Sequence, residues 1–443
     1  MAIAACLMTM CSFIVAANAK FDPVAFTVAQ STKLSFKNET TVPFTHITTN
    51  HMQRQDISGG VFTCKDGGVY KCQVYSLASP NLKTFLELWH NSQRVASLYG
   101  HVSGHNGAGG NSVVLDLNEG DIVQVKTRTN YQVDIFAYTN EIYNTFTCVQ
   151  IGSEAISNSD NAISAFSVTS DRNQNVVGGA SVLYDTQLVN INKGFNLDTG
   201  VYKALTAGIY IFHFFSLTHQ NEELWQDLFQ NDQYICSIKC VTDFDWTDAG
   251  NTAILHLNVN DTITVKAHAG IDNFLFGNPD QIFTTFSGVQ VITDLDMLSP
   301  ESFPVVAFSV ALVNNISVSS GSTILYDHVF VNYKTSYNIS TGHFVAPASG
   351  LYEFNYHGRT IRDSGIKLRL MQNQKYINSI YNVIPGHHAT AGNAAVLELN
   401  GGDVVRIESQ GFKNKLYGDP SEIYCTFSGY LLHAITPAEI IGK

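Results

Sequence analysis

The stretch "TGHFVAPASGLYEFNYHG" at residues 341–358 decides the fold, because apolar residues alternate on both sides of a turn. Phe344 and Ala346 alternate before the sequence Pro-Ala-Ser-Gly, and Tyr352 and Phe354 alternate after it. Alternation with a period of two is typical of strands that bury one face, and Pro with Gly marks the turn between them. We therefore expect two strands that form the central hairpin of a domain.

Two weaker versions of this stretch occur earlier, as "TGVYKALTAGIYIFHFFS" (199–216) and "GGVFTCKDGGVYKCQVYS" (59–76). A second motif, "GNSVVLDLNEGDIV" (110–123), returns as "GNTAILHLNVNDTI" (250–263) and "GNAAVLELNGGDVV" (392–405), and each copy closes on Thr-Phe. A spacing of roughly 140 residues is the size of a domain and is too long for a solenoid repeat.

The chain of 443 residues is therefore expected to contain three copies of one domain. We place these domains at residues 23–151, 164–292 and 305–433, joined by linkers at 152–162 and 293–304. Within each copy, strand-like segments follow one another, and turn sequences such as "HNSQ", "QNDQ" and "QNQK" occur where hairpins belong. Many short strands without helical periodicity favour an all-β sandwich, and a jelly roll is one arrangement that protects its edges.

Composition and charge exclude several classes of function. Hydrophobic residues make up 45% of the chain and charged residues only 14%, which argues against disorder. A net charge of −12, without any basic run, argues against a nucleic-acid partner. No serine-hydrolase elbow, zinc-protease motif or phosphate-binding glycine loop is found, so we expect no enzyme. The recurring Asp121, Asp261 and Asp403 follow turn residues, and we expect them to bond within hairpin turns.

The first 19 residues form an apolar run that ends in Ala17-Asn18-Ala19, the small-residue pattern of a secretory signal peptide cut near Lys20. A buried N-terminal helix is the alternative interpretation. No later apolar run is long enough to span a membrane. We therefore expect a secreted, extracellular protein.

Cysteine and glycosylation patterns agree with secretion. Six cysteines follow the leader, and their connectivity is open: Cys64, Cys72, Cys148, Cys236, Cys240 and Cys425. Cys64 and Cys72 flank the turn Asp66-Gly67-Gly68 and are candidates for a disulfide across a hairpin. On one extended strand, Cys236 and Cys240 would lie about 13 Å apart, which is too far to bond. Four sequons are candidate N-glycosylation sites: Asn38, Asn260, Asn315 and Asn338.

Four motifs in one order identify a family resemblance. They are Ala-Phe-Ser-Val (307–310), Thr-Gly-x-Phe-x-Ala-Pro-x-x-Gly-x-Tyr-x-Phe (341–354), Gly-Asn-x-Ala-x-Leu-x-Leu-x-x-Gly-Asp (392–403) and Thr-Phe-Ser-Gly (426–429). This order resembles the complement C1q globular-head family, and the resemblance covers roughly residues 23–433.

The first two copies depart from that pattern at specific residues. The second copy departs at Leu205 and Asn260. The first copy departs most, with Cys64 in place of alanine, Cys72 in place of phenylalanine, and Cys148 where the other copies have glycine.

The resemblance implies three ten-stranded jelly-roll domains, related to tumour necrosis factor, of a non-catalytic kind that packs as trimers. The chain has no collagen-like Gly-X-Y run to drive trimerisation. Linkers of about a dozen residues reach at most ~40 Å. We therefore predict a pseudo-trimer within one chain, and the alternatives are separated domains or a trimer between chains.

The loops before the three Gly-Asn motifs differ in chemistry, and loops on a rigid sandwich are where recognition usually occurs. The candidate ligand-binding residues are His101, His105, Trp246, His387 and His388. The candidate metal ligands, with calcium as the candidate ion, are Asp243, Asp245 and Asp248. The alternative is three solvated loops with unrelated substitutions.

The expected function is a secreted, non-catalytic, lectin-like pattern-recognition protein of innate immunity. It would bind carbohydrate or other repeated groups on microbial surfaces, with the three domains associating within one chain. The alternative is a structural protein of extracellular matrix, mucus or biomineral that binds calcium or another metal.

Overall fold

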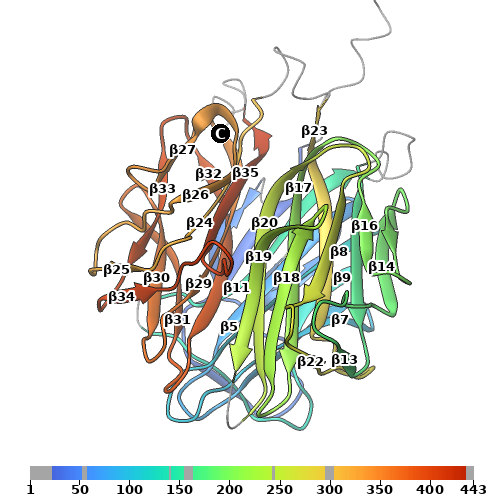
Figure 1. The fold of residues 1–443 in the computed structure, drawn as a ribbon, viewed down its shortest axis with the longest axis vertical. Helices are drawn as coiled ribbons and strands as arrows, with labels where there is room; N and C mark the ends of the chain where they lie inside the picture. The colour runs from blue at the N-terminus through green and yellow to red at the C-terminus, as the bar shows by residue number, and fades with distance from the viewer. Residues whose placement is uncertain are drawn as a thin grey trace, which may run out of the picture.

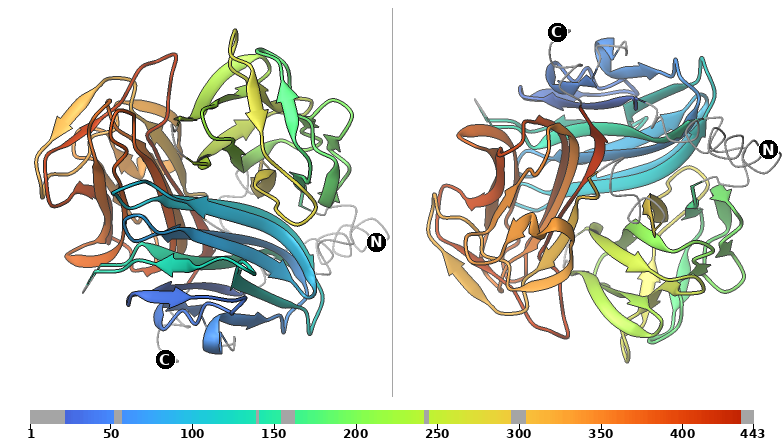
Figure 2. Two further views of the ribbon diagram at one scale, coloured as in Figure 1. Left: turned by 90° about the horizontal axis from the view of Figure 1, so that it is seen from below. Right: turned by 90° about the horizontal axis from the view of Figure 1, so that it is seen from above.

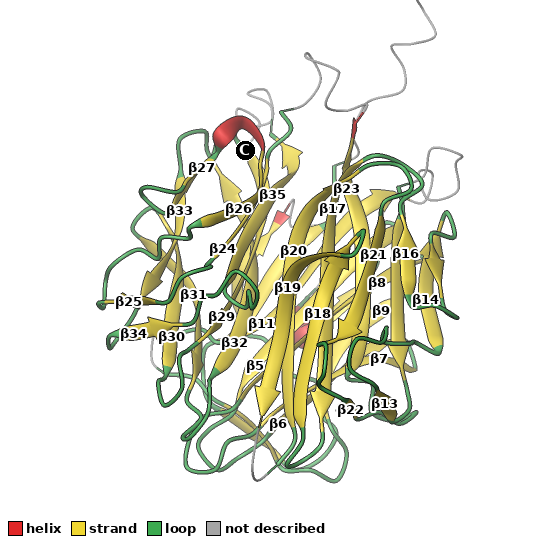
Figure 3. Ribbon diagram, in the orientation of Figure 1, coloured by secondary structure: helices red, strands yellow, loops and turns green. Residues whose placement is uncertain are grey.

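The computed structural model describes residues 22–51, 57–138, 141–153, 163–241, 245–294 and 304–435. The predicted signal peptide and most of both linkers lie outside these residues. Strands dominate the described chain (Figure 3), so the all-β prediction is confirmed. Within these ranges, no helix has both the length and the hydropathy needed to cross a membrane.

The elements follow the repeats in order. Copy 1 contains β1 (Ala25–Gln30), β2 (Leu34–Phe36), β3 (His46–Asn50), η2 (Ser58–Gly60), β4 (Val61–Thr63), β5 (Gly68–Leu77), β6 (Thr84–His90), β7 (Gln93–Gly100), β8 (Ala108–Leu117), β9 (Ile122–Thr127), β10 (Val133–Ile135) and β11 (Asn144–Ser153). Copy 2 contains β12 (Ala165–Ser170), β13 (Gln174–Val176), β14 (Thr186–Ile191), β15 (Phe195–Asn196), β16 (Val201–Lys203), β17 (Gly208–Thr218), β18 (Glu223–Gln230), β19 (Gln233–Val241), β20 (Thr247–Leu257), β21 (Thr262–Ala267), β22 (Asn273–Leu275) and β23 (Thr284–Thr293). Copy 3 contains β24 (Ala307–Ala311), β25 (Ile316–Val318), β26 (His328–Asn332), η3 (Tyr333–Thr335), β27 (Tyr337–Asn338), β28 (His343–Val345), β29 (Gly350–Arg359), β30 (Ile366–Gln372), β31 (Lys375–Asn382), β32 (Thr390–Leu399), β33 (Val404–Ser409), β34 (Asn414–Leu416) and β35 (Thr426–Ala434).

Each copy is a sandwich of two antiparallel sheets (Figure 1). In copy 3 the inner sheet has the order β26-β24-β35-β29-β32, and the outer sheet has the order β27-β28-β33-β30-β31. Copy 1 repeats this order as β3-β1-β11-β5-β8 and β4-β9-β6-β7, and copy 2 pairs its strands in the same way. Three jelly rolls are therefore confirmed, each with one or two short strands beyond ten among its described residues.

The expected hairpin at residues 341–358 is wrong. Strand β28 pairs with β27 and β33, whereas β29 pairs with β32 and β35, so the turn between them is a corner that joins the two sheets. The alternating residues face the same core from opposite sheets, and the rings of Phe344 and Phe354 lie 5.3 Å apart. Alternation reports one buried face but does not identify the strand's partner.

The recurring Phe of the Ala-Phe-Ser-Val motif lies at the centre of each core. In copy 3, Phe308 stacks on Phe344 and Tyr337 with ring centroids 5.1 and 5.2 Å away, and it meets the edge of Phe427 at 4.9 Å. All four side chains are buried. Offset and edge-to-face aromatic contacts add to the burial energy, which explains why both the Ala-Phe and the Thr-Phe motifs recur.

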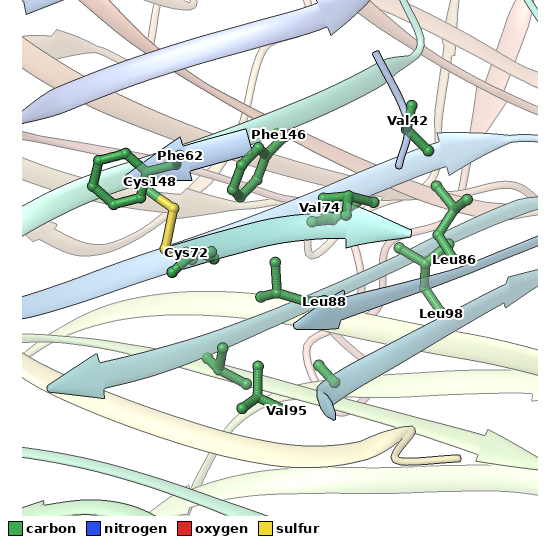
Figure 4. Packing of buried hydrophobic residues seen from close by; sticks show 14 of the residues in the cluster. Val42, Phe62, Cys72, Val74, Leu86, Leu88, Val95, Leu98, Phe146 and Cys148 are labelled. Carbon is green, nitrogen blue, oxygen red and sulfur yellow. A yellow bond between two sulfur atoms is a disulfide. The ribbon is translucent and has the colours of Figure 1, made fainter. Parts of the chain in front are cut away.

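The disulfide joins Cys72 to Cys148, so the expected Cys64–Cys72 bond is wrong (Figure 4). Cys64 follows β4 in the outer sheet and Cys72 lies on β5 in the inner sheet, because the turn between them is the same sheet-to-sheet corner. Cys72 and Cys148 are direct partners in the β5–β11 ladder. Burial raises the pKa of the Cys64 thiol to about 11, so it is unreactive.

The disulfide replaces a different contact in the other copies. There, the rings of Phe212 and Phe354 pack directly over Gly288 and Gly429, where no Cβ would fit. The matched variant Cys72→Phe/Cys148→Gly is therefore expected to fold. In the wild type, reduction opens a loop of 76 residues and should lower the free energy of unfolding by about 4 kcal/mol. Denaturant unfolding with and without dithiothreitol tests this, and equal sensitivity of both proteins to reductant would contradict it.

The three copies surround a common centre (Figure 2) and contact one another in a closed ring. In each copy, the buried asparagine of the Gly-Asn motif accepts a hydrogen bond from the threonine of the next copy's Thr-Phe motif. These donor and acceptor pairs, 2.6 to 2.7 Å apart, are Thr285 to Asn111, Thr426 to Asn251 and Thr145 to Asn393. The predicted pseudo-trimer is thus the arrangement of the described chain.

A second set of bonds repeats this cyclic order. A backbone N–H of β8, β20 or β32 donates to a hydroxyl on the first strand of the next copy. The pairs are Val114 to Ser167, Ile254 to Ser309 and Val396 to Thr27. Because the third copy bonds back to the first, no copy keeps a free interface of this kind among the residues described.

The recurring aspartates bond within and between turns, as expected. Asp403 accepts hydrogen bonds from the backbone of Asn400 in its own turn and from the side chain of Asn373 in the β30–β31 hairpin. Asp121 and Asp261 make the same contacts. Partial burial alone would raise the pKa of Asp403, but these hydrogen bonds outweigh it and lower the pKa.

The lowered pKa predicts a stability that depends on pH. The stabilisation by ionised Asp403 is complete above the ordinary carboxyl pKa and is lost as the pH falls through the lower folded-state value. Asp403→Ala should cost about 1–2 kcal/mol at pH 7, and the difference from wild type should narrow at pH 2. Denaturant unfolding at both pH values tests this, with exposed Asp198→Ala as the control. A gap of equal size at both pH values would contradict the assignment.

Candidate functional site

Strands β5, β17 and β29 line the pseudo-threefold axis, and every second residue of each strand points toward it. Equivalent residues of the three strands form layers along the axis. The first layer is apolar in all three copies (Val69, Ile209 and Leu351), whereas the following layers combine charged, polar and apolar residues. All these residues are buried. The axis is therefore a packed, asymmetric interior.

The layer after the apolar one contains an ion pair with both side chains fully buried. Lys71 of copy 1 donates to Glu353 of copy 3 over 2.6 Å, and Ile211 of copy 2 takes the third position. Glu353 also accepts hydrogen bonds from Gln73 and from the hydroxyl of Tyr430. A buried charge is tolerated only with such partners, so this layer requires copies 1 and 3 to be neighbours.

The next layer along the axis contains hydrogen-bonded polar side chains, and the layer after it contains three side-chain rings. Thr252 bonds to Nδ1 of His213 at 2.9 Å and to Nε2 of His357 at 3.0 Å. Burial lowers the pKa of His357 to about 3, so its imidazole is neutral. The rings of Tyr75, Phe215 and His357 lie 6.1 to 6.3 Å from one another, which is close to threefold symmetry.

The glycine of each Gly-Asn motif makes room for these rings. A Cβ added to Gly110, Gly250 or Gly392 would lie 2.0 to 2.5 Å from the ring of its own ladder partner. The Gly-Asn pair therefore serves assembly twice, because the glycine admits the axial ring and the asparagine bonds to the next copy.

Breaking the buried ion pair should be costly. Lys71→Met leaves Glu353 buried without its counter-ion, and we expect a loss of about 3–5 kcal/mol in the free energy of unfolding. Lys266→Met makes the same chemical change in an ion pair whose partner, Asp232, is 87% exposed. That control should change the free energy of unfolding far less, because solvent screens the exposed pair. Equal losses in urea unfolding would show that the axial pair has no special role.

The three candidate loops end at one pole of the axis, which is opposite the linkers. Ser153, Thr293 and Ala434 at the linker ends pair with the first residues of β5, β17 and β29. Residues 108–110, 248–250 and 390–392, where the loops lead into β8, β20 and β32, instead lie beside the last residues of those strands, and together they line a cavity.

His101 and Asp245 meet at the interface between copies 1 and 2. Nδ1 of His101 lies 2.8 Å from Asp245, and Nζ of Lys83 lies 3.1 Å from the same carboxylate. Burial alone would raise the pKa of Asp245, but hydrogen bonds from His101 and the Trp246 backbone help to hold it well below its usual range. This contact fixes two loops of different copies to each other.

Trp246 also belongs to that interface. Its ring stacks on Phe276 of copy 2 at 4.7 Å and meets the edge of Tyr99 of copy 1 at 5.7 Å. Only part of the tryptophan remains exposed.

Two of the other candidate histidines, His105 and His388, have contacts with residues of their own copies. His105 closes a small turn with Val102. Nδ1 of His388 lies 2.7 Å from the carbonyl of Thr360, and burial lowers the pKa of this histidine. His387 is partly exposed. These imidazoles are not among the residues that line the axial cavity.

The candidate metal ligands are only partly described. Asp243 lies outside the described residues. Asp248 accepts a hydrogen bond from Gly110 of copy 1, and burial raises its pKa well above the usual value. Among the residues that the structure places, no group of three or more His, Cys, Asp or Glu side chains could hold a metal ion. Calcium binding stays a prediction.

The four candidate glycosylation sites are all exposed: Asn38, Asn260, Asn315 and Asn338. The side-chain oxygen of Asn315 accepts a hydrogen bond from Gly418, and that of Asn338 accepts one from Ser340. Glycosylation of these residues stays a prediction.

Comparison with known proteins gives one family. The family model described as "C1q domain" matches residues 25–148, 165–291 and 307–432, which is most of the chain. Members of this family are generally non-catalytic recognition or structural proteins, and they include innate immune and other extracellular proteins.

The similar curated proteins match one copy at a time. The rat "Complement C1q tumor necrosis factor-related protein 6" is 30% identical over 131 residues, which are 29% of this chain and 50% of that protein. Human "Complement C1q tumor necrosis factor-related protein 3" is 32% identical over 129 residues, 29% of this chain and 51% of that protein. Zebrafish "Caprin-2" is 34% identical over 131 residues, 29% of this chain and 14% of that protein. The chain thus spans at most about half the length of these relatives.

Among solved structures, the "Globular Domain of Zebrafish Complement 1qA protein" is 19% identical. It covers 29% of this chain and 98% of that chain, with a TM-score of 0.26. The three matches to the family model coincide with the three jelly rolls, and the chain belongs to the C1q domain family.

Proposed function

We propose that this protein is an extracellular, non-catalytic recognition protein that binds carbohydrate or other repeated groups on microbial surfaces. The observation that supports this proposal is the meeting of three different loops at one pole of a rigid scaffold. A homotrimer presents one loop three times, whereas this chain presents three chemistries around one axis.

The scaffold suits presentation of these loops. The ring of bonds between copies uses buried side chains, so the loops are held by a packed interior rather than by flexible contacts. Exposed residues are available in the loops at the pole, for example Ser103, Gly104 and Pro385. Loops held by a rigid scaffold bind with a lower cost of ordering.

The proposed calcium binding by the candidate aspartates is tested separately from ligand binding. Asp245 already bonds to His101 and Lys83, so an ion at this carboxylate would compete with an existing contact. The alternative function, a metal-binding matrix or biomineral protein, predicts binding to chitin or calcium carbonate without preference among sugars.

A glycan array with the secreted protein, in calcium and in EDTA, tests the proposal. We expect binding to a restricted set of glycans, and a loss of at least about tenfold in His105→Ala/His387→Ala, because both side chains lie in the loops at the pole. Glu119→Ala is the matched control, since its exposed turn follows β8 at the linker end. Absence of any glycan binding, or equal binding by the double variant, would contradict the proposal.

A further inference from the structure

At the end of the axis where the three loops lie, one of three equivalent positions is an arginine and the other two are leucines. In the last layer, copies 1 and 2 place Leu77 and Leu217, and copy 3 places Arg359. The leucines pack into apolar clusters at their interfaces. Arg359 is only 3% exposed, although arginine stays charged at every physiological pH.

The contacts of Arg359 leave its charge without an ion-pair partner at close range, and the carboxylate of Glu422 acts on it only from farther away. Its Nη1 donates to the carbonyl of Lys239 over 2.5 Å, and its guanidinium lies 4.5 Å from the centre of the Tyr424 ring. Its Nε is buried without a hydrogen-bond partner, and no carboxylate in the described ranges forms an ion pair with it. By contrast, Arg369 of the same copy donates from both Nε and Nη2 to Glu408.

A cavity of about 40 Å³ lies at this end of the axis, and residues of all three copies line it, Arg359 and Lys239 among them. At the equivalent positions of the other two interfaces, Tyr99 and Tyr381 belong to the same apolar clusters as the leucines. Here the equivalent residue is Lys239, whose ammonium bonds to Glu223 at 2.8 Å and lies over the Trp225 ring at 3.3 Å. A charged lysine that lines the cavity thus stands at this interface, where the other two interfaces have a tyrosine.

We propose that this cavity binds the carboxylate group of a ligand, with Arg359 as its counter-ion. A carboxylate is a preferred hydrogen-bond acceptor for a guanidinium. The volume admits a group of a few atoms and no large polyanion.

The remaining charges around the cavity favour a singly charged group. Lys239 is already paired with Glu223. His357 is neutral, because burial lowers its pKa to about 3. Asp248 lines the same cavity, and burial raises its pKa, which favours the protonated form that can donate to a carboxylate oxygen.

Thermal unfolding of the full chain measures this binding. Sodium acetate is compared with sodium chloride at equal ionic strength, because a ligand that binds only the folded state raises the unfolding midpoint. We expect acetate to raise the midpoint by at least ~2 °C over chloride. The absence of an acetate-specific rise up to 100 mM, together with no heat of binding in calorimetric titration, would overturn the proposal.

Glucuronate and glucose then separate two sources of the carboxylate. A rise with glucuronate and none with glucose supports an acidic saccharide as the natural ligand. A rise with acetate alone supports a small free carboxylate. The inference rests on Arg359 and its cavity, so a negative glycan array would leave it standing and would count only against the proposed function.

Two variants locate the effect. Arg359→Leu introduces the residue of the other two copies, so it should fold, unfold at a higher temperature in chloride and lose the response to acetate. Lys239→Tyr should fill the cavity and lose the response while Arg359 is retained. Arg362→Leu removes the same charge from an exposed neighbouring position and should respond like wild type. An undiminished response in Arg359→Leu would overturn the assignment, and direct calorimetry on the wild type decides the question if a variant does not fold.

Discussion

In each copy, a buried asparagine bonds to the following copy, and the three bonds close a ring. The rest of the structure depends on this closure. A jelly roll of this family has one broad face of its inner sheet that must be covered, and here the two neighbouring copies cover it. Because head-to-tail contacts with threefold rotation close on themselves, three copies are sufficient and a fourth has no place.

Within this ring the copies are not interchangeable. A homotrimer of copy 1 would place three lysines at the level of Lys71, and a homotrimer of copy 3 would place three glutamates there. Only mixed copies give the ion pair with Ile211 as its apolar neighbour. Buried polar contacts of this kind specify one arrangement among several that apolar packing alone would allow. Sequence differences among the copies therefore affect assembly most at the buried positions along the axis.

Much of the fold could be predicted from local pattern. The repeat of Gly-Asn and Thr-Phe motifs identified three equivalent domains, and turn chemistry placed Asp403 and its equivalents correctly. The corner at residues 341–358 could not be recognised, because alternation is the same whether the next strand pairs with its neighbour or joins the opposite sheet. The disulfide had a signal, since Cys72 and Cys148 are both departures in the same copy. It identifies the bond only when Cys72 and Cys148 are known to be direct partners in the pairing of β5 with β11.

The site was harder to predict than the fold. His101 was a candidate ligand-binding residue and Asp245 a candidate metal ligand, but the structure bonds the two to each other across an interface. Arg359 was missed because it belongs to a strand with an alternating pattern and not to a loop. A comparison of the three copies at that position, leucine twice and arginine once, is the observation that could have found it.

The buried ion pair also has a consequence for the order of events on the ribosome. Lys71 and Glu353 are 282 residues apart in the chain. At a synthesis rate of about 5–20 residues per second, the first jelly roll, which ends at Ser153, is complete roughly 10–40 s before Glu353 has been made. During that interval the ammonium group of Lys71 has no Glu353 with which to pair, so the charged layer of the axis cannot form. The ring of three copies can therefore close only after the last third of the chain has been translated.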